Sequence, residues 1–329
     1  MAVACRRLAI TLSIGLCLVT VVPLRAAAEP IKLSTSRLML NLEDPGQDQV
    51  GKLRFAGGIA IRSGNDAFGG LSGLALTPAG DRIISVSDRG NWFTAMLVED
   101  DLGRLIGLDA AEYGPMLDDI GGRLGGSWRD AESVEVGPAG TLFVSFERAH
   151  RVWRYQIGRS LTAARSVELR SPLALAGAPK NGGIEALTVL PNGEILAISE
   201  DFRDNNKDLH GWLMHLDVAL PITLRATGEF KPTGLAVLPD GNLLLLERRF
   251  SHIGGLGIRL STIETETVKP RAMLISREIA RFAPPLTVDN FEGVAARAGP
   301  DGKTWIYIIS DDNFQAIQRT LLLKFELIE

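Results

Sequence analysis

One arrangement of apolar and polar positions repeats five times along the chain. Each repeat is a short apolar run, a Pro-x-Gly turn and a second apolar run that ends in an acidic residue. The repeats occupy residues 70–90, 130–148, 183–201, 232–249 and 291–313. Proline fixes φ and glycine accepts a positive φ, so the triplet suits a tight reversal of the chain. Because the flanking runs are short and rich in Val, Ile and Leu, each repeat is predicted to form a β-hairpin.

A third strand-like run follows most of these hairpins. These runs are residues 151–157, 211–218, 257–263 and 321–327. Three or four strands per repeat, at a period of roughly 50 residues, are typical of propeller blades. We therefore expect an all-β propeller, closed by pairing of the run at 52–61 with the last blade. The pattern contains five blades, and an irregular sixth is the alternative, built from segments 31–42, 100–127 and 258–289.

The N-terminus has the features of a secretory signal. The basic pair Arg6–Arg7 precedes an apolar run of residues 8–22, and small alanines follow. The run is short for a transmembrane helix, so we expect residues 1–28 to be removed and the protein to be periplasmic or secreted. An uncleaved membrane anchor is the alternative. The remaining residues, 29–329, contain no Pro- or Ser-rich linker and are predicted to form one domain.

The cysteines and the charge narrow the classes of partner. Both cysteines, Cys5 and Cys17, lie in the signal, so the mature chain has no thiol for a disulfide, a metal or a nucleophile. The signal also contains three basic residues and no acids, which leaves 35 − 3 = 32 Lys and Arg against 39 Asp and Glu. We expect an acidic monomer that acts on a small anionic or ester substrate, with no nucleic-acid partner and no stable membrane insertion.

Acidic residues recur at equivalent places in the hairpins. The first strand of each hairpin starts at Ser72, Glu132, Glu185, Thr233 or Glu292. The second strand ends at Asp88, Glu147, Glu200, Glu247 or Asp311. Both positions lie at the edge opposite the turn, because each arm of the hairpin spans roughly 20 Å. Radial stacking of the blades places all ten residues on one face, with the start positions nearest the axis if the first strand is innermost.

Eight of these ten residues are carboxylates, which repel one another unless cations lie among them. Arginines are one source of positive charge, and three directly follow end positions: Arg89, Arg148 and Arg248. A divalent cation is another, and Ca²⁺ suits hard oxygen ligands in an exported protein. The predicted ligands are Glu132, Glu185, Glu292, Asp311, Asp88 and Glu200. The alternative is that each acid pairs with an arginine and only joins neighbouring blades.

Candidates for catalysis and substrate binding lie on the same face. His150 and His252 follow end positions and are candidate general bases, together with the acids Glu132 and Glu185. The candidate substrate-binding residues are Arg89, Arg148, Arg248 and Asn313. The sequence has no Gly-x-Ser-x-Gly, no His-Glu-x-x-His and no phosphate-cradling glycine loop. These absences argue against a serine esterase, a zincin and a nucleotide-dependent enzyme.

The order of several sequence blocks resembles the phytase-like family of exported bacterial proteins, known for "esterase-like activity of phytase". The blocks are GLSGLAL with SDRG, DAES with FER, GIEAL with SED, LLLLER, and FEGVA with SDDNF. The resemblance covers roughly residues 50 to 327. It implies a secreted or periplasmic propeller with a hydrolase activity directed at phosphoesters and dependent on Ca²⁺.

Two better-understood propeller types extend what the resemblance implies. DAES at 130–133 looks like part of the Asp-Ala-acid-Asp-Pro signature of alkaline β-propeller phytases, which carries over Asp130 and Glu132. Ser-Val replaces the Asp-Pro that follows in that signature, which counts against phytate as the substrate. Gluconolactonase-type propellers hold one metal through Glu, Asn and Asp. An analogous set here is Glu185 or Glu292 with Asn313 and Asp311.

The sequence therefore predicts an exported, metal-assisted hydrolase of phosphoester or carboxylic ester bonds. A non-catalytic propeller that binds a ligand or a protein, and a gluconolactonase-type lactonase, are the alternatives. In an enzyme, several carboxylates should surround one cation-sized point. In a binding module, every acid should instead pair with an arginine.

Overall fold

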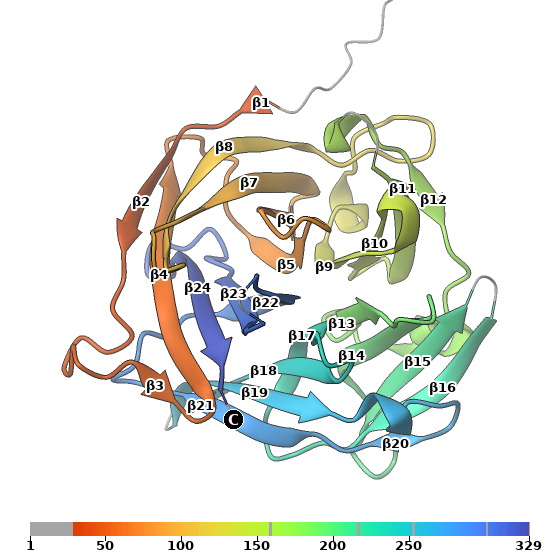
Figure 1. Ribbon diagram of the computed structural model, residues 1–329. Helices are drawn as coiled ribbons and strands as arrows, with labels where there is room; N and C mark the ends of the chain where they lie inside the picture. Colours follow the sequence, from red (N-terminus) through yellow and green to blue (C-terminus); the bar gives the residue numbers. More distant parts are fainter. Residues whose placement is uncertain (1–28, 158–159, 216–217, 252–253, 301, 329) are drawn as a thin grey trace, which may run out of the picture.

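The chain forms a propeller of five β-sheets around a central axis (Figure 1). The computed structural model describes residues 29–157, 160–215, 218–251, 254–300 and 302–328. The predicted signal, residues 1–28, lies outside the described residues. Within the described ranges there is no helix long and apolar enough to cross a membrane.

The five sheets are named blades I to V in chain order. From the axis outward, blade I contains β5 (Leu71–Leu76), β6 (Arg82–Ser87), β7 (Asn91–Glu99), β8 (Leu105–Pro115) and β1 (Glu29–Pro30). Blade II contains β9 (Ala131–Val136), β10 (Thr141–Phe146), β11 (Arg151–Gln156) and β12 (Ser166–Glu168). Blade III contains β13 (Ile184–Val189), β14 (Ile195–Arg203), β15 (Leu209–His215), β16 (Val218–Leu224) and β20 (Met273–Leu274).

The last two blades complete the ring. Blade IV contains β17 (Lys231–Val237), β18 (Leu243–Ser251), β19 (Gly255–Ile263) and β21 (Arg277–Phe282). Blade V contains β22 (Phe291–Ala298), β23 (Thr304–Ser310), β24 (Thr320–Leu327), β4 (Leu53–Ser63) and β2 (Leu33–Arg37), with β3 (Gln49–Val50) beside β4. Short 3-10 helices lie in the connections: η1 (Gly126–Trp128), η2 (Pro138–Gly140), η3 (Leu161–Ala163), η4 (Leu173–Gly177) and η5 (Thr265–Thr267).

This arrangement confirms the predicted propeller and its closure. The first strand of each repeat is the innermost strand of its blade, and the Pro-x-Gly turns join it to the second. β4 pairs antiparallel with β24, so the N-terminal run joins the C-terminal blade as expected. The segments considered for a sixth blade instead add strands to the five blades, among them β2, β8, β20 and β21. The blade count is therefore five.

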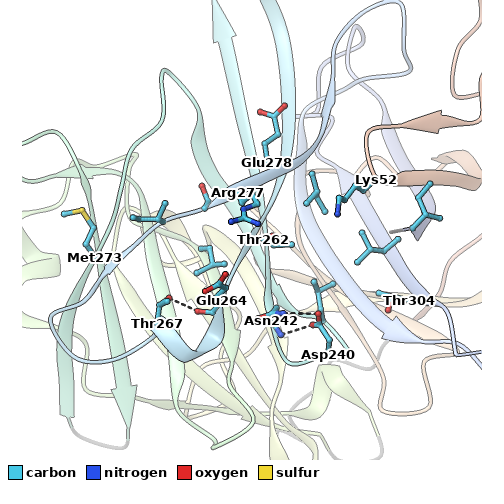
Figure 2. A pocket seen from close by; sticks show the side chains of 17 residues that line it. Lys52, Asp240, Asn242, Thr262, Glu264, Thr267, Met273, Arg277, Glu278 and Thr304 are labelled. Atoms are coloured by element: carbon cyan, nitrogen blue, oxygen red, sulfur yellow. Dashed lines mark hydrogen bonds between the residues drawn. The ribbon is translucent and has the colours of Figure 1, made fainter.

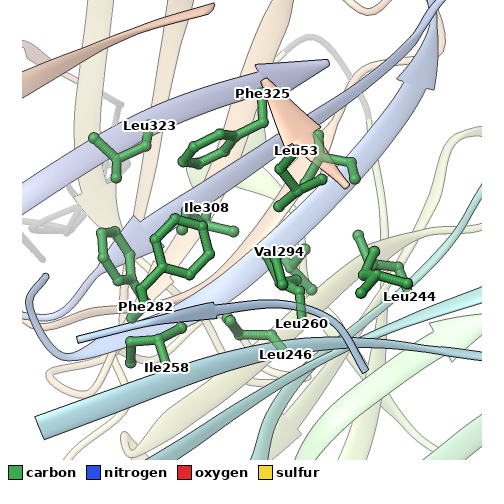
Figure 3. Close-up of a cluster of buried hydrophobic side chains, with 14 of the residues drawn as sticks. Leu53, Leu244, Leu246, Ile258, Leu260, Phe282, Val294, Ile308, Leu323 and Phe325 are labelled. Atoms are coloured by element: carbon green, nitrogen blue, oxygen red, sulfur yellow. The ribbon is translucent and has the colours of Figure 1, made fainter. Parts of the chain in front are cut away.

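Hydrophobic side chains fill the spaces between adjacent blades. Between blades IV and V, for example, the rings of Phe282 and Phe325 meet edge to face with centroids 5.3 Å apart (Figure 3). Leu246 of β18 and Ile308 of β23 belong to the same buried cluster. Such packing holds each blade at a set angle to its neighbours, and removing one buried aromatic ring typically costs about 3–5 kcal/mol. The loops at the channel mouth are positioned by this rigid frame.

Candidate functional site

The inner strand of every blade has a β-bulge near its start. The pairing with the second strand slips by one residue at Ser72, Glu132, Glu185, Thr233 and Glu292. A bulge breaks the alternation of side chains along a strand and re-aims the extra residue. The inner strands are neighbours around the axis, so the five bulges lie together at one end of the propeller axis, called here the channel mouth. Ser72 and Thr233 stay buried at these positions, and Oγ1 of Thr233 donates to the carbonyl of Phe291 on the next inner strand at 3.1 Å.

Three carboxylates converge on blade II. Asp130, Glu132 and Glu147 each offer one oxygen, and these atoms all lie within 4.8 Å of one another. Among the described His, Cys, Asp and Glu side chains, only this group, called here the acid trio, meets that criterion. It forms because the backbone N–H of Glu147 donates to the carbonyl of Asp130 at 2.9 Å, which joins the end of β10 to the start of β9.

Two members of the acid trio are anchored through one oxygen each. Nε of Arg148 lies 2.6 Å from Oδ2 of Asp130. Oε1 of Glu147 accepts backbone hydrogen bonds from Gly182 and Gly183 at 2.6 and 2.7 Å. Each carboxylate has a second oxygen, so it can be held in place and still face a cation. Of these three residues, only Glu132 belongs to the ligand set predicted from the sequence. Asp130 lies in the DAES motif, but neither it nor Glu147 belongs to that set.

Glu132 and Glu185 form no ion pair with a described residue, although the positive charges of Arg248 and Lys231 act on Glu185 from a greater distance. No described residue donates a hydrogen bond to either carboxylate, and Glu185 is only 9% exposed. Burial raises the pKa of Glu132 well above its usual value, and repulsion from Glu147 and Glu292 adds to the rise. Burial also raises the pKa of Glu185, reinforced by repulsion from Glu200 and Glu132. A cation at this point would relieve the cost of both groups.

Several acids at the ends of the second strands add to the negative electrostatic potential around Glu132 and Glu185. Burial raises the pKa of Asp311 to about 9, with repulsion from Glu292 next in size. It raises the pKa of Glu147 to about 7, and that of Asp88 to about 6. The field therefore spans blades I, II and V rather than a single hairpin, and perturbed carboxylates of this kind cluster at functional sites.

The face of the propeller that carries the start and end positions is called here the acidic face. In a second part of this face, one arginine neutralises the acids. Nη2 of Arg248 lies 3.3 Å from Oε1 of Glu200 and 3.4 Å from Oε1 of Glu292. Its Nη1 donates to Oδ1 of Asn290 at 2.6 Å. Lys231 adds a contact to Oε2 of Glu200 at 3.5 Å. The acidic face thus combines both arrangements expected from the sequence, with paired acids toward blade IV and an uncompensated cluster toward blade II.

Glu247 was expected to end its strand, but β18 continues to Ser251, and this acid is separate from the negative field. Glu247 is 3% exposed and binds Arg259 through both oxygens, with Nη2 to Oε1 at 2.6 Å and Nε to Oε2 at 2.8 Å. The guanidinium of Arg259 also stacks over Phe230, 4.3 Å from its centroid. This bidentate pair holds β18 to β19 and has no role at the channel mouth.

The remaining candidates for substrate binding lie around the rim. Arg89 is exposed and stacks on Phe314, with Cζ 3.2 Å from the ring centroid. Arg148 is committed to Asp130, as described above. Asn313 is exposed, and its backbone N–H donates to Oδ1 of Asp311 at 2.6 Å. Among the described residues, no carboxylate forms an ion pair with the guanidinium of Arg89, whereas the guanidinium of Arg148 is paired with Asp130.

Of the two histidines predicted as general bases, the structure describes one. The imidazole of His150 donates through Nε2 to the carbonyl of Pro179 at 3.0 Å. Its Nδ1 is buried against Gly183, where a Cβ would lie 2.4 Å away. His150 therefore packs behind the Gly182–Gly183 clamp on Glu147 and supports it. His252 lies outside the described residues.

The donor set of the acid trio fits a hard divalent cation. It consists of carboxylate oxygens alone, which are the ligands that Ca²⁺ prefers. Three carboxylates in partial burial carry more negative charge than the single Arg148 contact offsets. The chemistry of the group thus allows either a bound cation or shared protons, and the raised pKa values are the mark of the second state.

Two cavities lie on opposite faces of the propeller. One, of about 640 Å³, opens on the acidic face between blades IV and V and includes Arg248 and Asn290 in its lining. A larger one, of about 910 Å³, lies at the turn-bearing end of the same blades (Figure 2). There, Nδ2 of Asn242 donates to Asp240 at 3.0 Å and Oγ1 of Thr267 to the carbonyl of Glu264 at 2.6 Å. The larger cavity is remote from the acid trio and has its polar groups joined in local turns.

Comparison with known proteins gives one family. A model of the phytase-like family, described as "Esterase-like activity of phytase", matches residues 66–314. No curated protein matches the chain. A gluconolactonase structure from Xanthomonas campestris is 14% identical, with 93% of this chain and 89% of that chain covered and a TM-score of 0.42. Virginiamycin B lyase from Staphylococcus aureus is 12% identical, with 84% and 85% covered and a TM-score of 0.39.

Proposed function

The chain belongs to the phytase-like family, and we propose that it is an exported hydrolase that uses Ca²⁺ to cleave phosphoester or carboxylic ester bonds. The observation that carries this proposal is the acid trio, whose oxygens converge within 4.8 Å. Buried carboxylates without counter-charges destabilise a fold, so their presence at the mouth of an axial channel calls for a ligand. A divalent cation satisfies the charge and the donor type together.

A cation bound there would polarise the ester oxygen and lower the pKa of a water molecule. In the proposed reaction, Glu185 takes a proton from a water molecule, the oxygen of this water bonds to the acyl carbon or the phosphorus, and the bond to the alcohol oxygen breaks. Glu185 is the proposed general base, because a carboxylate whose pKa is raised by burial binds a proton more readily than a solvent-exposed one. The proton then passes to the departing alcohol oxygen. Arg89 is placed at the rim to attract an anionic group.

The cellular setting belongs to the same proposal. Removal of residues 1–28 would release an acidic, cysteine-free chain into the periplasm or the medium. Ca²⁺ is abundant outside the cytosol, and extracellular modules bind it with dissociation constants of about 10⁻⁴–10⁻³ M. The proposed enzyme acts as a monomer on small substrates.

The test is hydrolysis of p-nitrophenyl acetate and p-nitrophenyl phosphate by chelator-treated protein, with and without added Ca²⁺. We expect Ca²⁺-dependent release of p-nitrophenol from at least one substrate, lowered about 100-fold or more in Glu185→Gln. Glu112→Gln, an exposed position on β8, is the matched control and should retain full activity. Absence of Ca²⁺-dependent turnover with both substrates would count against the proposal.

A second candidate function is a non-catalytic propeller that binds a ligand on this face. The contacts of Arg248 with Glu200 and Glu292 favour it, because they show that part of the acidic face is already neutralised within the protein. If Ca²⁺ neither binds nor supports turnover, this candidate takes precedence. The two functions therefore differ in what occupies the acid trio.

A further inference from the structure

The cavity on the acidic face adjoins the neutralised part of the site. Arg248 lines this cavity of about 640 Å³ and also reaches Glu292, 3.4 Å away. Glu292 is the bulged residue of its inner strand, as Glu132 of the acid trio is of β9. The cavity and the acid trio therefore lie at the same end of the propeller axis. Cavities of about 300–1,000 Å³ are the usual size for binding a small organic molecule.

The lining combines apolar walls with amide groups. Its apolar side chains are Phe250, Leu256, Val288 and Ile317. Its amide side chains are Asn290, Asn313, Gln315 and Gln318. A few polar groups among hydrophobic walls are typical of sites that orient an organic ligand. Phe250 and Ile317 are 67% and 87% exposed, so they contribute to the cavity wall rather than to the core.

The two arginines that line the cavity are both paired with acids. Nε of Arg319 lies 3.1 Å from Oδ2 of Asp289, and both residues line the cavity. Arg248 is engaged by Asn290, Glu200 and Glu292, as described above. Neither guanidinium faces the cavity without a partner, so the cavity lacks the surplus positive charge that a phosphate-rich group requires. The chemistry of the lining therefore selects an uncharged group.

We propose that this cavity binds the neutral, aromatic-sized hydrocarbon part of a carboxylic ester whose carbonyl is presented to the acid trio. This inference rests on the proposed function and narrows it, since it favours aryl or alkyl carboxylic esters over polyphosphorylated substrates. Phe250 and Ile317 contact the hydrocarbon, and the amides of Gln315 and Gln318 orient it. These residues determine specificity and take no part in bond cleavage.

The test separates binding from turnover. The probe for binding is N-(2-naphthyl)acetamide, a neutral amide that the proposed reaction does not consume readily, followed by its own fluorescence. The variant is Phe250→Ala combined with Ile317→Gln. Leu173→Gln, 87% exposed in η4 and absent from the cavity lining, is the matched control. Loss of two apolar contacts is expected to weaken binding about tenfold in the double variant and to leave the control unchanged.

Kinetics provide the second readout. With 2-naphthyl acetate the double variant is expected to raise KM about tenfold, while KM for methyl acetate stays the same and kcat changes little for both. Equal probe binding by wild type, double variant and control would overturn the inference, even if esters are hydrolysed. Tenfold weaker binding in the double variant, with no turnover of 2-naphthyl acetate or p-nitrophenyl phosphate by the wild type, would support the cavity and refute the hydrolase. The two proposals can therefore fail separately.

Discussion

Glu132 and Glu185 occupy the same bulge position on neighbouring inner strands, and neither receives a hydrogen bond from a described residue. Repulsion from Glu132 contributes to the raised pKa of Glu185. On the other side of the axis, Glu292 occupies an equivalent bulge but has Arg248 3.4 Å away. The five-fold repeat of the backbone thus carries an uneven distribution of charge, and this unevenness is what marks one part of the channel mouth as a candidate site.

Calcium should bind the chelator-treated protein at the acid trio. We expect a heat of binding in titration calorimetry and a melting temperature that rises with Ca²⁺, because a ligand that binds only the folded state stabilises it by about 2.7 kcal/mol at 100 times its Kd. Glu132→Gln should abolish both effects, whereas Glu112→Gln should keep them. Identical Ca²⁺ responses in wild type and Glu132→Gln would place the ion elsewhere.

Glu185→Gln should stabilise the protein when no metal is present. The raised pKa of Glu185 means that the folded state binds a proton more tightly than the unfolded chain does, so its contribution to the free energy of unfolding falls as pH rises above the unfolded value of about 4.5. Glutamine keeps the shape without this cost, and a gain of roughly 1–3 kcal/mol is expected at pH 7. Urea unfolding in the presence of a chelator measures it. A loss of stability would show that Glu185 has a favourable partner.

Arg248→Met should destabilise the protein. The change leaves Glu200 and Glu292 without their shared guanidinium, and removing one partner of a buried ion pair costs about 3–5 kcal/mol. Arg54→Met is the control, since Arg54 forms a surface pair with Glu326 at 3.4 Å and such pairs contribute about 0–1 kcal/mol. Chemical unfolding of both variants gives the comparison. Similar losses in the two variants would mean that Arg248 is a solvated surface charge.

The pH dependence of stability should include Glu135, at the opposite mouth of the axial channel. Burial raises the pKa of Glu135 to about 7, above the value of 4.5 expected when the chain unfolds. Between these values the folded protein keeps a proton that the unfolded chain has lost, so the contribution of Glu135 to stability falls as pH rises from 4.5 through 7 and stays low above it.

Glu135→Gln removes this titration. The variant is expected to match wild type at about pH 4 and to be more stable by roughly 1–3 kcal/mol at about pH 8.5. Glutamine can keep both contacts, because its oxygen can accept from the backbone N–H of Val136, which donates to Oε1 of Glu135 at 2.8 Å, and its amide can donate to Oγ1 of Thr188, which lies 3.1 Å from Oε2 of Glu135. Thermal melts of both proteins across this pH range provide the measurement. A stability difference that does not change with pH would show that Glu135 does not titrate in this range.

Local sequence determined the strands, the turns and the one-face placement of the acids. Alternating short apolar runs and Pro-x-Gly turns specify hairpins through φ restriction and side-chain periodicity, which act within a few residues. Equal spacing from the turn then places both ends of each hairpin at one edge, which is why Glu132 and Glu147 could be expected on the same face. Ring closure by β4 followed from the same reasoning, because an unpaired run preceded the first repeat.

Tertiary structure alone decided which acids are compensated. Arg248 neutralises Glu200 and Glu292 from neighbouring blades, and the clamp on Glu147 comes from Gly182 and Gly183 at the start of the next repeat. These partners are distant in sequence, so no spacing rule reports them. The acid trio depends on a backbone contact between Asp130 and Glu147 that exists only once the hairpin has formed. Charge, burial and ligand geometry are sums over the packed neighbourhood, whereas strand formation is a property of the segment itself.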